Sequence, residues 1–555
     1  MKKLNVFFVN LPSIPLQKLQ DQKDRNRLIK VFPFGILYLS SFLKKQGCAN
    51  VVRCIDYFAT NFKQSKPIEE IISSVAVSTA CGIEPDVLAI SLTMTTSYEF
   101  FNLMLPILKK LWPTTTVVVG GHTATNAIEE VLKNKHVDYV IAGEGEEAFY
   151  SLITNLNKKE YLETLKGIHF SDKIDKTFSR TNPIQDLDSL PFPDWGLIDT
   201  EFYLDTDGSQ LFWDGFNNQT EGKTKAATIL TSRGCPFQCI FCAANNISGR
   251  KMRLRKTEKI TEEVLELYKK YNINYLSIFD DLALPTEKRT KELLSAISKL
   301  EIPELRTSFS QAVNINATTT KMIDDIIKYT KPAVISFPVE ATERKTQQTI
   351  KKKISLEKAQ KLIRYSQNRG LIVTINIIFG FPNETLDEMK KTIETINNVL
   401  RPDWTQFAIA LPVVGSNMYE QFSNLGFIKS SPEFWGQNLL NHRNFDTPWT
   451  TSEEINALRE YANLYCNFIK NKCIVDGENE KAKKLYSRVS ELYPAQIFAL
   501  ENLRQIAIKE RNILEEEKLK TKIQELLNNN SESQHLYSTY GYLMPTLREV
   551  YDTIR

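Results

Sequence analysis

The sequence predicts an α/β protein in three parts: a doubly wound, Rossmann-like N-terminal domain, an open (β/α)6 partial barrel, and a C-terminal α-helical domain. Over about the first 160 residues, short apolar runs alternate with amphipathic segments, as in a parallel sheet covered on both faces. From Ala226 onward the alternation gives six strand–helix units, two fewer than a closed barrel has. The last ~105 residues contain amphipathic helical segments.

Size and charge narrow the class of protein. The chain has 555 residues, enough for about three or four domains. We expect the N-terminal domain at 1–160, a linker at 161–224, the barrel at 225–425 and the C-terminal helical domain at 426–555. The 70 basic and 66 acidic residues give a net charge of +4, so neither nucleic acid nor a membrane is an expected partner. No apolar run approaches the roughly 20 residues that span a bilayer. The N-terminus lacks a small-residue cleavage site, so we expect it to form a first strand.

Three segments of the N-terminal domain are candidates for ligand binding. Its strands are expected at 4–10, 51–55, 86–92, 116–119 and 139–142, and its helices at 34–46, 68–79, 98–111, 123–133 and 146–157. Ligands of such sheets bind where the strands end. The segments at those positions are 91–97, 120–122 and 143–146. The glycines there would let a ligand approach the backbone.

The remaining elements follow the same periodicity. Barrel strands are expected at 226–233, 275–279, 306–311, 334–338, 372–379 and 406–411, with helices at 257–271, 286–300, 318–329, 355–369 and 385–400. C-terminal helices are expected at 452–470, 479–492, 495–509 and 513–527, followed by a polar loop at 528–533. The Tyr-rich end is expected to pack on the body of the protein.

The loop after the first barrel strand carries three cysteines in a C-x-x-x-C-x-x-C spacing: Cys235, Cys239 and Cys242. Iron–sulfur cubanes normally take four cysteines, so three leave one iron open to a ligand that is not protein. The alternatives are inert buried thiols and zinc, which would require a fourth cysteine or histidine nearby. The nearest histidine is His169, more than sixty residues upstream, so the spacing favours a cluster.

The triad and its flanks, Thr-Ser-Arg-Gly-Cys-Pro-Phe-Gln-Cys-Ile-Phe-Cys, resemble the radical S-adenosylmethionine (SAM) superfamily. The resemblance implies a [4Fe–4S] cluster whose fourth iron is chelated by SAM, and cleavage of SAM to a 5′-deoxyadenosyl radical that abstracts hydrogen. It also implies an oxygen-sensitive site, which fits a reducing cytoplasm.

Other barrel segments resemble the superfamily's SAM contacts at successive strand ends. The resemblance implies that Asp280 and Asp281 hold the amino group or ribose, and that Glu340 lies in a segment similar to G-x-E-S but without its Gly or Ser. It places Gly380 and Pro382, in a G-x-P-x-E-T-like segment, beside the adenine. Thr385 belongs to the same segment, and Ser416 belongs to a segment after the sixth strand that resembles P-x-x-G-T-x-x-Y. For these two residues, helix capping is the favoured interpretation.

The N-terminal segments, by their order and spacing, resemble the domain that precedes the barrel in cobalamin-dependent radical SAM enzymes. The resemblance implies that cobalamin contacts the following residues: Ser91, Thr93, Thr95, Gly120, Gly121, His122, Gly143, Glu144 and Gly145. The D-x-H-x-x-G loop of other cobalamin proteins is missing, which implies base-off binding without a histidine ligand. For His122, the alternative to cofactor contact is a loop residue that bonds to backbone. The alternative is a vestigial domain that only packs on the barrel. Residues 186–195 resemble the D-L-D-x-L-P-x-P segment that joins the two domains in this family.

The sequence therefore predicts a cytoplasmic cobalamin-dependent radical SAM enzyme, with methyl transfer from methylcobalamin to an unactivated carbon as the expected reaction. The substrate would be a small molecule or a peptide, and an external donor of flavodoxin or ferredoxin type would supply electrons. Two alternatives stay open: a radical rearrangement or cyclisation without methyl transfer, and a non-catalytic cobalamin or Fe–S sensor. No side chain is assigned a catalytic role.

Overall fold

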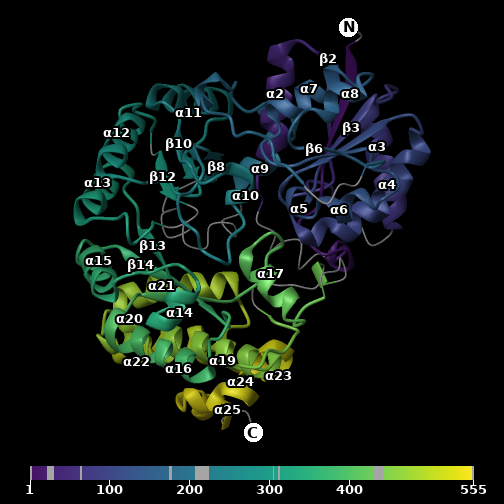
Figure 1. Cartoon of the computed structure of the whole chain (residues 1–555). Coiled ribbons are helices and arrows are strands. Elements are labelled where there is room, and N and C mark those ends of the chain that lie inside the picture. The colour runs from purple at the N-terminus through teal and green to yellow at the C-terminus, as the bar shows by residue number, and fades with distance from the viewer. Residues whose placement is uncertain are drawn as a thin grey trace.

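The structure is a computed structural model in which the N-terminal domain lies beside the barrel and the C-terminal helices pack against the barrel's far end (Figure 1). It describes residues 3–21, 30–62, 66–173, 178–206, 224–303, 305–309, 313–429, 434–435 and 442–552. The fold class is the one that the sequence predicts.

The N-terminal domain is a six-stranded sheet in the order β2-β1-β3-β4-β5-β6, covered on both faces. Its strands are β1 (Leu4–Asn10), β2 (Ala49–Asp56), β3 (Val87–Ser91), β4 (Thr116–Gly120), β5 (Tyr139–Ile141) and β6 (Ile168–Phe170). All neighbours pair in parallel except β5 and β6. Successive side chains of β1 point to opposite faces of the sheet. Phe7 and Val9 belong to the apolar core on one face, and Val6 and Phe8 belong to the core on the other.

The helices of this domain divide between the two faces. On the Phe7 side lie α3 (Ile68–Ala80), α4 (Tyr98–Leu111) and α6 (Ile128–Leu132), and on the Val6 side α2 (Phe34–Gln46) and α7 (Glu146–Thr154). The expected helix 123–133 is wrong as one element. It is two short helices, α5 (His122–Asn126) and α6, because the backbone of Ala127 between them leaves the helical region. Strand β6 lies in the stretch expected to be a linker.

The barrel consists of two sets of parallel strands. The first contains β8 (Thr224–Ile229), β11 (Tyr275–Ile278) and β12 (Arg306–Phe309), and the second contains β13 (Val334–Glu340), β14 (Ile372–Phe379) and β15 (Trp404–Ile409). The N–H of Val313 donates to the carbonyl of Ser336 at 2.8 Å and connects the sets. The helices are α11 (Thr257–Tyr271), α12 (Glu287–Ser298), α13 (Thr320–Thr330), α14 (Arg344–Thr349), α15 (Leu356–Asn368) and α16 (Leu386–Thr395), which continues as η7 (Ile396–Leu400). Residues 310–311 of the third expected strand lie outside the described part.

The first expected barrel strand, 226–233, is interrupted. Strand β8 ends at Ile229, and β9 (Ser232–Arg233) turns away to pair antiparallel with β10 (Arg253–Leu254). The cause is Asp280, whose carboxylate takes the N–H of Thr231 at 2.6 Å and removes it from the ladder. The interruption places the cysteine loop directly after a fixed backbone bend. At the opposite edge, β7 (Asp205–Thr206) adds a short antiparallel strand beside β8.

The C-terminal part forms its own apolar core. Its helices are α19 (Ser452–Leu464), η8 (Tyr465–Ile469), α20 (Lys472–Val475), α21 (Asn479–Leu492), α22 (Ile497–Lys509), α23 (Ile513–Asn529), α24 (Ser531–Tyr540) and α25 (Thr546–Asp552). The polar loop expected at 528–533 is wrong, because the side chain of Asn530 caps α24 and leaves a single residue between two helices. Tyr537 and Tyr551 pack together in this region, whereas Tyr542 is exposed. In the described part of the chain, no helix is long and apolar enough to cross a membrane.

Candidate functional site

The cysteine loop is held in place by backbone contacts from several elements. The N–H of Cys235 donates to the carbonyl of Gly249 at 3.2 Å, and that of Ile240 donates to Ile350 at 3.2 Å. Gly234 has a φ of +92°, and a Cβ there would lie 2.5 Å from the carbonyl oxygen of Lys251. A glycine is therefore required immediately before the first cysteine.

The three thiols of the cysteine loop lie close enough to interact electrostatically with one another. Three sulfur donors in one loop are the donor set of an iron–sulfur cluster that leaves one iron open. Burial raises the pKa of all three thiols, that of Cys239 to about 11, and the ammonium of Lys352 opposes that rise. A bound metal would have to stabilise the thiolates.

Asp280 and Asp281 lie directly beyond β11, as expected, but they have different surroundings. Asp280 is buried, and its carboxylate accepts hydrogen bonds from Thr231 and Ser232. Burial raises its pKa to about 6 although these groups stabilise the anion. Asp280 therefore fixes the backbone that leads into the cysteine loop. Asp281 is exposed, and it acts electrostatically on the thiols of Cys235 and Cys242.

Glu340 ends β13 in a left-handed conformation with a φ of +65°, unusual for a residue with a side chain. The Nζ of Lys352 lies 2.9 Å from its Oε1, and both side chains are about one-tenth exposed. Non-glycine residues in this region of backbone space cluster at functional sites. The pair presents one negative and one positive group close to the cysteine loop.

The turn after β14 is organised by Glu384. Its carboxylate accepts the N–H groups of Gly380 at 2.7 Å and Phe381 at 3.1 Å, and Pro382 is buried beside them. Gly380 has a φ of +84°, and a Cβ would lie 2.3 Å from the side chain of Ile455. Its conformation is thus explained by protein packing alone.

The two residues for which capping was the favoured interpretation behave in that way. Thr385 forms a capping box with Glu388 at the start of α16. Ser416 accepts the N–H of Tyr419 at the start of α17 (Asn417–Asn424). The capping interpretation is confirmed for both.

The carboxyl ends of β3 and β4 bring together five of the predicted cobalamin contacts: Ser91, Thr93, Thr95, Gly120 and Gly121. The hydroxyls of Ser91 and Thr93 lie 3.1 Å apart on the surface, and Thr95 begins the short helix η2 (Thr95–Ser97). Gly120 has room for a Cβ, whereas at Gly121, with a φ of +102°, a Cβ would lie 2.9 Å from the carbonyl oxygen of Leu92. The polar, accessible edge near Ser91 fits a ligand that carries amide groups.

His122 lies between the two domains. Burial lowers the pKa of its imidazole, while a hydrogen bond with the backbone of Ala243 raises it. Ala243 directly follows Cys242 in the sequence. The imidazole is therefore engaged with the residue that directly follows the cysteine triad.

The segment after β5 faces protein. Gly143 donates its N–H to Thr125, and a Cβ on it would lie 2.4 Å from Thr181. A Cβ on Gly145 would meet Leu39 at 3.4 Å. Glu144 is buried, with its oxygens 2.6 and 3.0 Å from the guanidinium of Arg253. This environment gives Gly143 and Glu144 structural roles.

Sequence reasoning missed two sets of charged residues. Arg233 and Arg253 pair with the glutamates of the 143–146 segment, and Lys352 pairs with Glu340. The only signal was the position of Arg233 two residues before Cys235. Separations of 87 and 109 residues hide the two arginine contacts from any periodicity argument.

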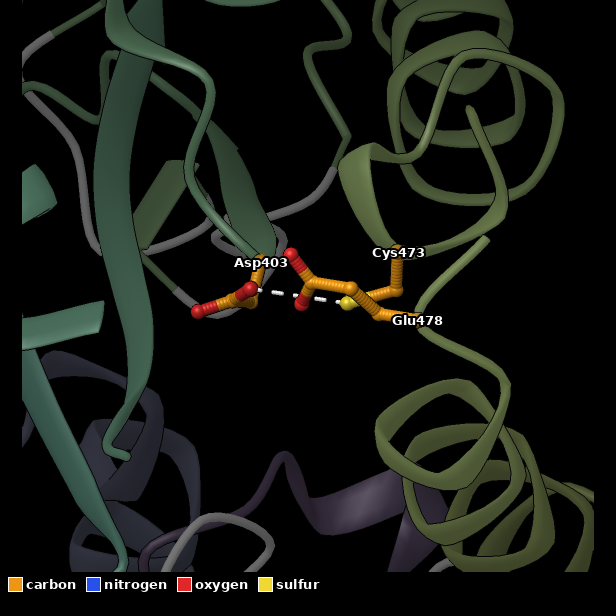
Figure 2. Close-up of side chains that lie close together, drawn as sticks. All are labelled: Asp403, Cys473 and Glu478. Atoms are coloured by element: carbon orange, nitrogen blue, oxygen red, sulfur yellow. Dashed lines mark hydrogen bonds between the residues drawn. The ribbon is translucent and has the colours of Figure 1, made fainter. Parts of the chain in front are cut away.

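A further group of Asp403, Cys473 and Glu478 joins the barrel to the C-terminal helices (Figure 2). Lys481 Nζ lies 2.7 Å from Asp403, the N–H of Val373 donates to the same carboxylate at 2.7 Å, and the Cys473 thiol donates at 3.4 Å. The carboxylate is thus already neutralised and hydrogen-bonded. This group is an anchor between two parts of the chain.

Two family profiles match the chain. The one described as the B12 binding domain covers residues 26–153, and the one described as the Radical SAM superfamily covers residues 229–396. The first contains the segments at 91–97, 120–122 and 143–146, and the second contains the cysteine triad.

Several curated proteins resemble the chain over most of its length. An uncharacterized methyltransferase of Pyrococcus horikoshii is 26% identical over 70% of this chain and 78% of its own. The cytidylyl-2-hydroxyethylphosphonate methyltransferase of Streptomyces wedmorensis is 24% identical over 72% and 79%. The anaerobic magnesium-protoporphyrin IX monomethyl ester cyclase of Rubrivivax gelatinosus is 22% identical over 71% and 66%.

Solved structures share the fold. OxsB, a cobalamin-dependent S-adenosylmethionine radical enzyme solved with aqua-cobalamin and S-adenosylmethionine, has a TM-score of 0.62 at 14% identity, covering 100% of this chain and 84% of OxsB. TsrM, a radical S-adenosylmethionine methyltransferase from Kitasatospora setae solved with cobalamin and a [4Fe–4S] cluster, has a TM-score of 0.57 at 14% identity, covering 78% and 80%. At these identities the likeness concerns the fold.

Proposed function

Because the chain belongs to the cobalamin-dependent radical SAM enzymes, we propose that it transfers a methyl group to an unactivated carbon of a small-molecule or peptide substrate. The observation that carries the proposal is the contact between two helix ends of the B12-binding domain and both flanks of the cysteine loop. A protein in which both cofactors serve one reaction needs such proximity.

The chain's own residues would bind and orient. Cys235, Cys239 and Cys242 would hold the [4Fe–4S] cluster, and Asp280 keeps the preceding backbone in place. Glu340 and Lys352 offer opposite charges that match the ammonium and carboxylate of SAM. When bound, the cluster and SAM supply a hydrogen-abstracting radical, and cobalamin supplies a methyl donor.

On the cobalamin side, Ser91, Thr93 and Thr95 offer hydroxyls at an accessible sheet edge, and Gly120 leaves the backbone uncovered. Other residues of these segments support this edge through contacts within the protein: Gly121, His122, Gly143, Glu144 and Gly145. We propose that the first group touches the ligand and the second supports it.

Two relatives named methyltransferases, at 26% and 24% identity, favour methyl transfer. The relative named a cyclase, at 22% identity, supports a second candidate, radical cyclisation without methyl transfer. Both reactions need electrons, for which we propose an external flavodoxin or ferredoxin, and an oxygen-sensitive cluster favours a reducing cytoplasm.

The test is anaerobic reconstitution of the full chain with iron, sulfide and hydroxocobalamin, followed by incubation with SAM deuterated in its methyl group and extracts of the source cells. We expect a deuterated product formed together with S-adenosylhomocysteine and 5′-deoxyadenosine. A product without label, formed with 5′-deoxyadenosine alone, would establish the cyclisation candidate. Label in the product of a Cys235→Ala variant would overturn the radical SAM assignment.

A further inference from the structure

Both flanks of the cysteine loop contact helix ends of the N-terminal domain, the start of α7 and the end of α5. On the leading flank, the guanidinium of Arg233 lies 2.7 Å from the carboxylate of Glu146 and 3.5 Å from that of Glu144. Arg233 is two residues before Cys235, and both glutamates follow β5. One side chain thus links the cluster loop to the end of a strand in the B12-binding domain.

The trailing flank has a second contact of the same kind. The amide nitrogen of Asn246, four residues after Cys242, donates to Asn126 Oδ1 at 2.6 Å and to the carbonyl of Gly415 at 2.8 Å. Asn126 is in α5, immediately after the Gly120–Gly121 turn. A Cβ on Gly415 would lie 2.2 Å from Asn126, so the junction is closely packed.

The ion pair of Arg233 and Glu146 is buried, so each charge needs the other for compensation. The side chain of Arg233 is 13% exposed and that of Glu146 is 5% exposed. Among the described residues, the second carboxylate oxygen of Glu146 has no hydrogen-bond partner. Glu144 has Arg253 as another partner, whereas Glu146 relies on Arg233.

Such a pair is better suited to fixing an arrangement than to adding stability. The desolvation of two buried charges offsets much of their attraction, whereas displacement of one leaves the other uncompensated. Any shift of the B12-binding loops against the cysteine loop would separate Arg233 from Glu146. The native arrangement is therefore favoured over displaced ones.

We propose that Arg233, Glu146 and Asn246 are positioning residues that set the geometry between the cobalamin-binding loops and the cluster loop. The inference rests on the proposed function, because it assumes that both cofactors bind where the loops meet. These side chains act on the reaction through the distance and orientation of the two cofactor sites, and they need not touch either cofactor.

The test compares Glu146→Gln and Asn246→Ala with Glu263→Gln in the reconstituted holoenzyme. Glu263 is a matched control because it forms a buried 2.6 Å ion pair with Arg255 inside the barrel. The measurements are iron and cobalamin content, thermal unfolding, and the electron paramagnetic resonance relaxation rate of cob(II)alamin next to the reduced cluster.

We expect Glu146→Gln and Asn246→Ala to keep wild-type iron and cobalamin content but to change that relaxation rate at least about twofold, while Glu263→Gln leaves it unchanged. Arg233→Lys, which retains the charge, should lie between wild type and Glu146→Gln. If Glu146→Gln does not fold, Asn246→Ala decides the question with the same measurement.

Two results would count against the idea, and they are distinguishable. Wild-type relaxation in loaded Asn246→Ala and Glu146→Gln would overturn the positioning role while leaving the proposed function intact. A wild-type protein that loads iron but no cobalamin would overturn the proposed function and the inference with it.

Discussion

Asn467 pairs with Thr405 as an additional strand would. Its Oδ1 accepts the N–H of Thr405 and its Nδ2 donates to the carbonyl of Thr405, both at 2.8 Å. Thr405 lies on β15, the last strand of its sheet, where edge groups would otherwise lack partners. Asn467 belongs to η8, so a helical segment of the C-terminal part closes an edge of the open barrel.

Asn467→Ala should destabilise this junction, because two buried backbone groups lose their partners. Each such group costs about 1–3 kcal/mol, so we expect local opening of β15 to become easier by about 3 kcal/mol. Hydrogen exchange of the Thr405 amide measures the effect. Asn502→Ala, which removes one bond to the carbonyl of Phe468, is the control and should leave that amide protected.

Replacing any cysteine of the triad should abolish SAM cleavage without unfolding the protein. Cys235→Ala, Cys239→Ala and Cys242→Ala each remove a cluster ligand but no large core side chain. Iron content and 5′-deoxyadenosine formation are the measurements. Cys466→Ser and Cys473→Ser are the controls, because the first thiol is buried in the barrel core and the second in the C-terminal core, and they should leave iron content unchanged. Deoxyadenosine formation by a triple triad variant would contradict the assignment.

The two neighbouring glycines after β4 should respond differently to substitution. The sequence predicts that a ligand approaches the backbone at both glycines, but Gly121 is already required by the carbonyl of Leu92. At Gly120 the nearest atom to a Cβ would be Ile141 O at 3.7 Å, which is an ordinary contact. We expect Gly120→Val to lower cobalamin content without lowering the apoprotein's melting temperature, and Gly121→Val to lower both.

Spectrophotometric cobalamin content and thermal unfolding of the apoprotein distinguish the two cases. The same preparations should retain wild-type iron content, because neither glycine touches the cysteine triad. Full cobalamin loading of Gly120→Val would remove this turn from the binding site.

The parts of the molecule that the sequence predicted well are those governed by local pattern. Helices 34–46, 98–111, 257–271 and 479–492 and strands 4–10 and 372–379 have the expected bounds, because their apolar periodicity lies within the segments themselves. The cysteine triad was identifiable for the same reason, since its three ligands are only three and four residues apart.

The remaining features depend on contacts between distant segments. Strand β8 ends at Ile229 because the N–H of Thr231 donates instead to Asp280, which lies 49 residues after Thr231. Strand β6 has three residues, too few for a periodic signal. Arg233 and Glu146 are each plausible as solvated charges, and only the fold places them together in a buried interface. Local propensity carries no information about such pairs.

Glu384 should give the apoprotein a stability that falls as pH rises. Burial raises the pKa of Glu384 from 4.5 to about 8, despite hydrogen bonds from the N–H groups of Phe381 and Gly380. The folded state therefore binds a proton that the unfolded state has released between these pH values. Its contribution is fully present below about pH 4.5 and is lost as pH rises toward about 8, at no more than about 1.4 kcal/mol per unit.

Urea unfolding of wild type and Glu384→Gln at pH 5, 6, 7 and 8 measures this contribution. We expect the variant to lack the decline, because a neutral amide keeps an acceptor for the two backbone N–H groups without the buried charge. Glu388→Gln is the control: burial raises the pKa of Glu388, but hydrogen bonds from Thr385 and Lys345 outweigh this and lower it overall. The stabilisation that Glu388 contributes is therefore lost only below about pH 4.5. Equal pH slopes for wild type and Glu384→Gln would show that Glu384 is ionised in the folded protein.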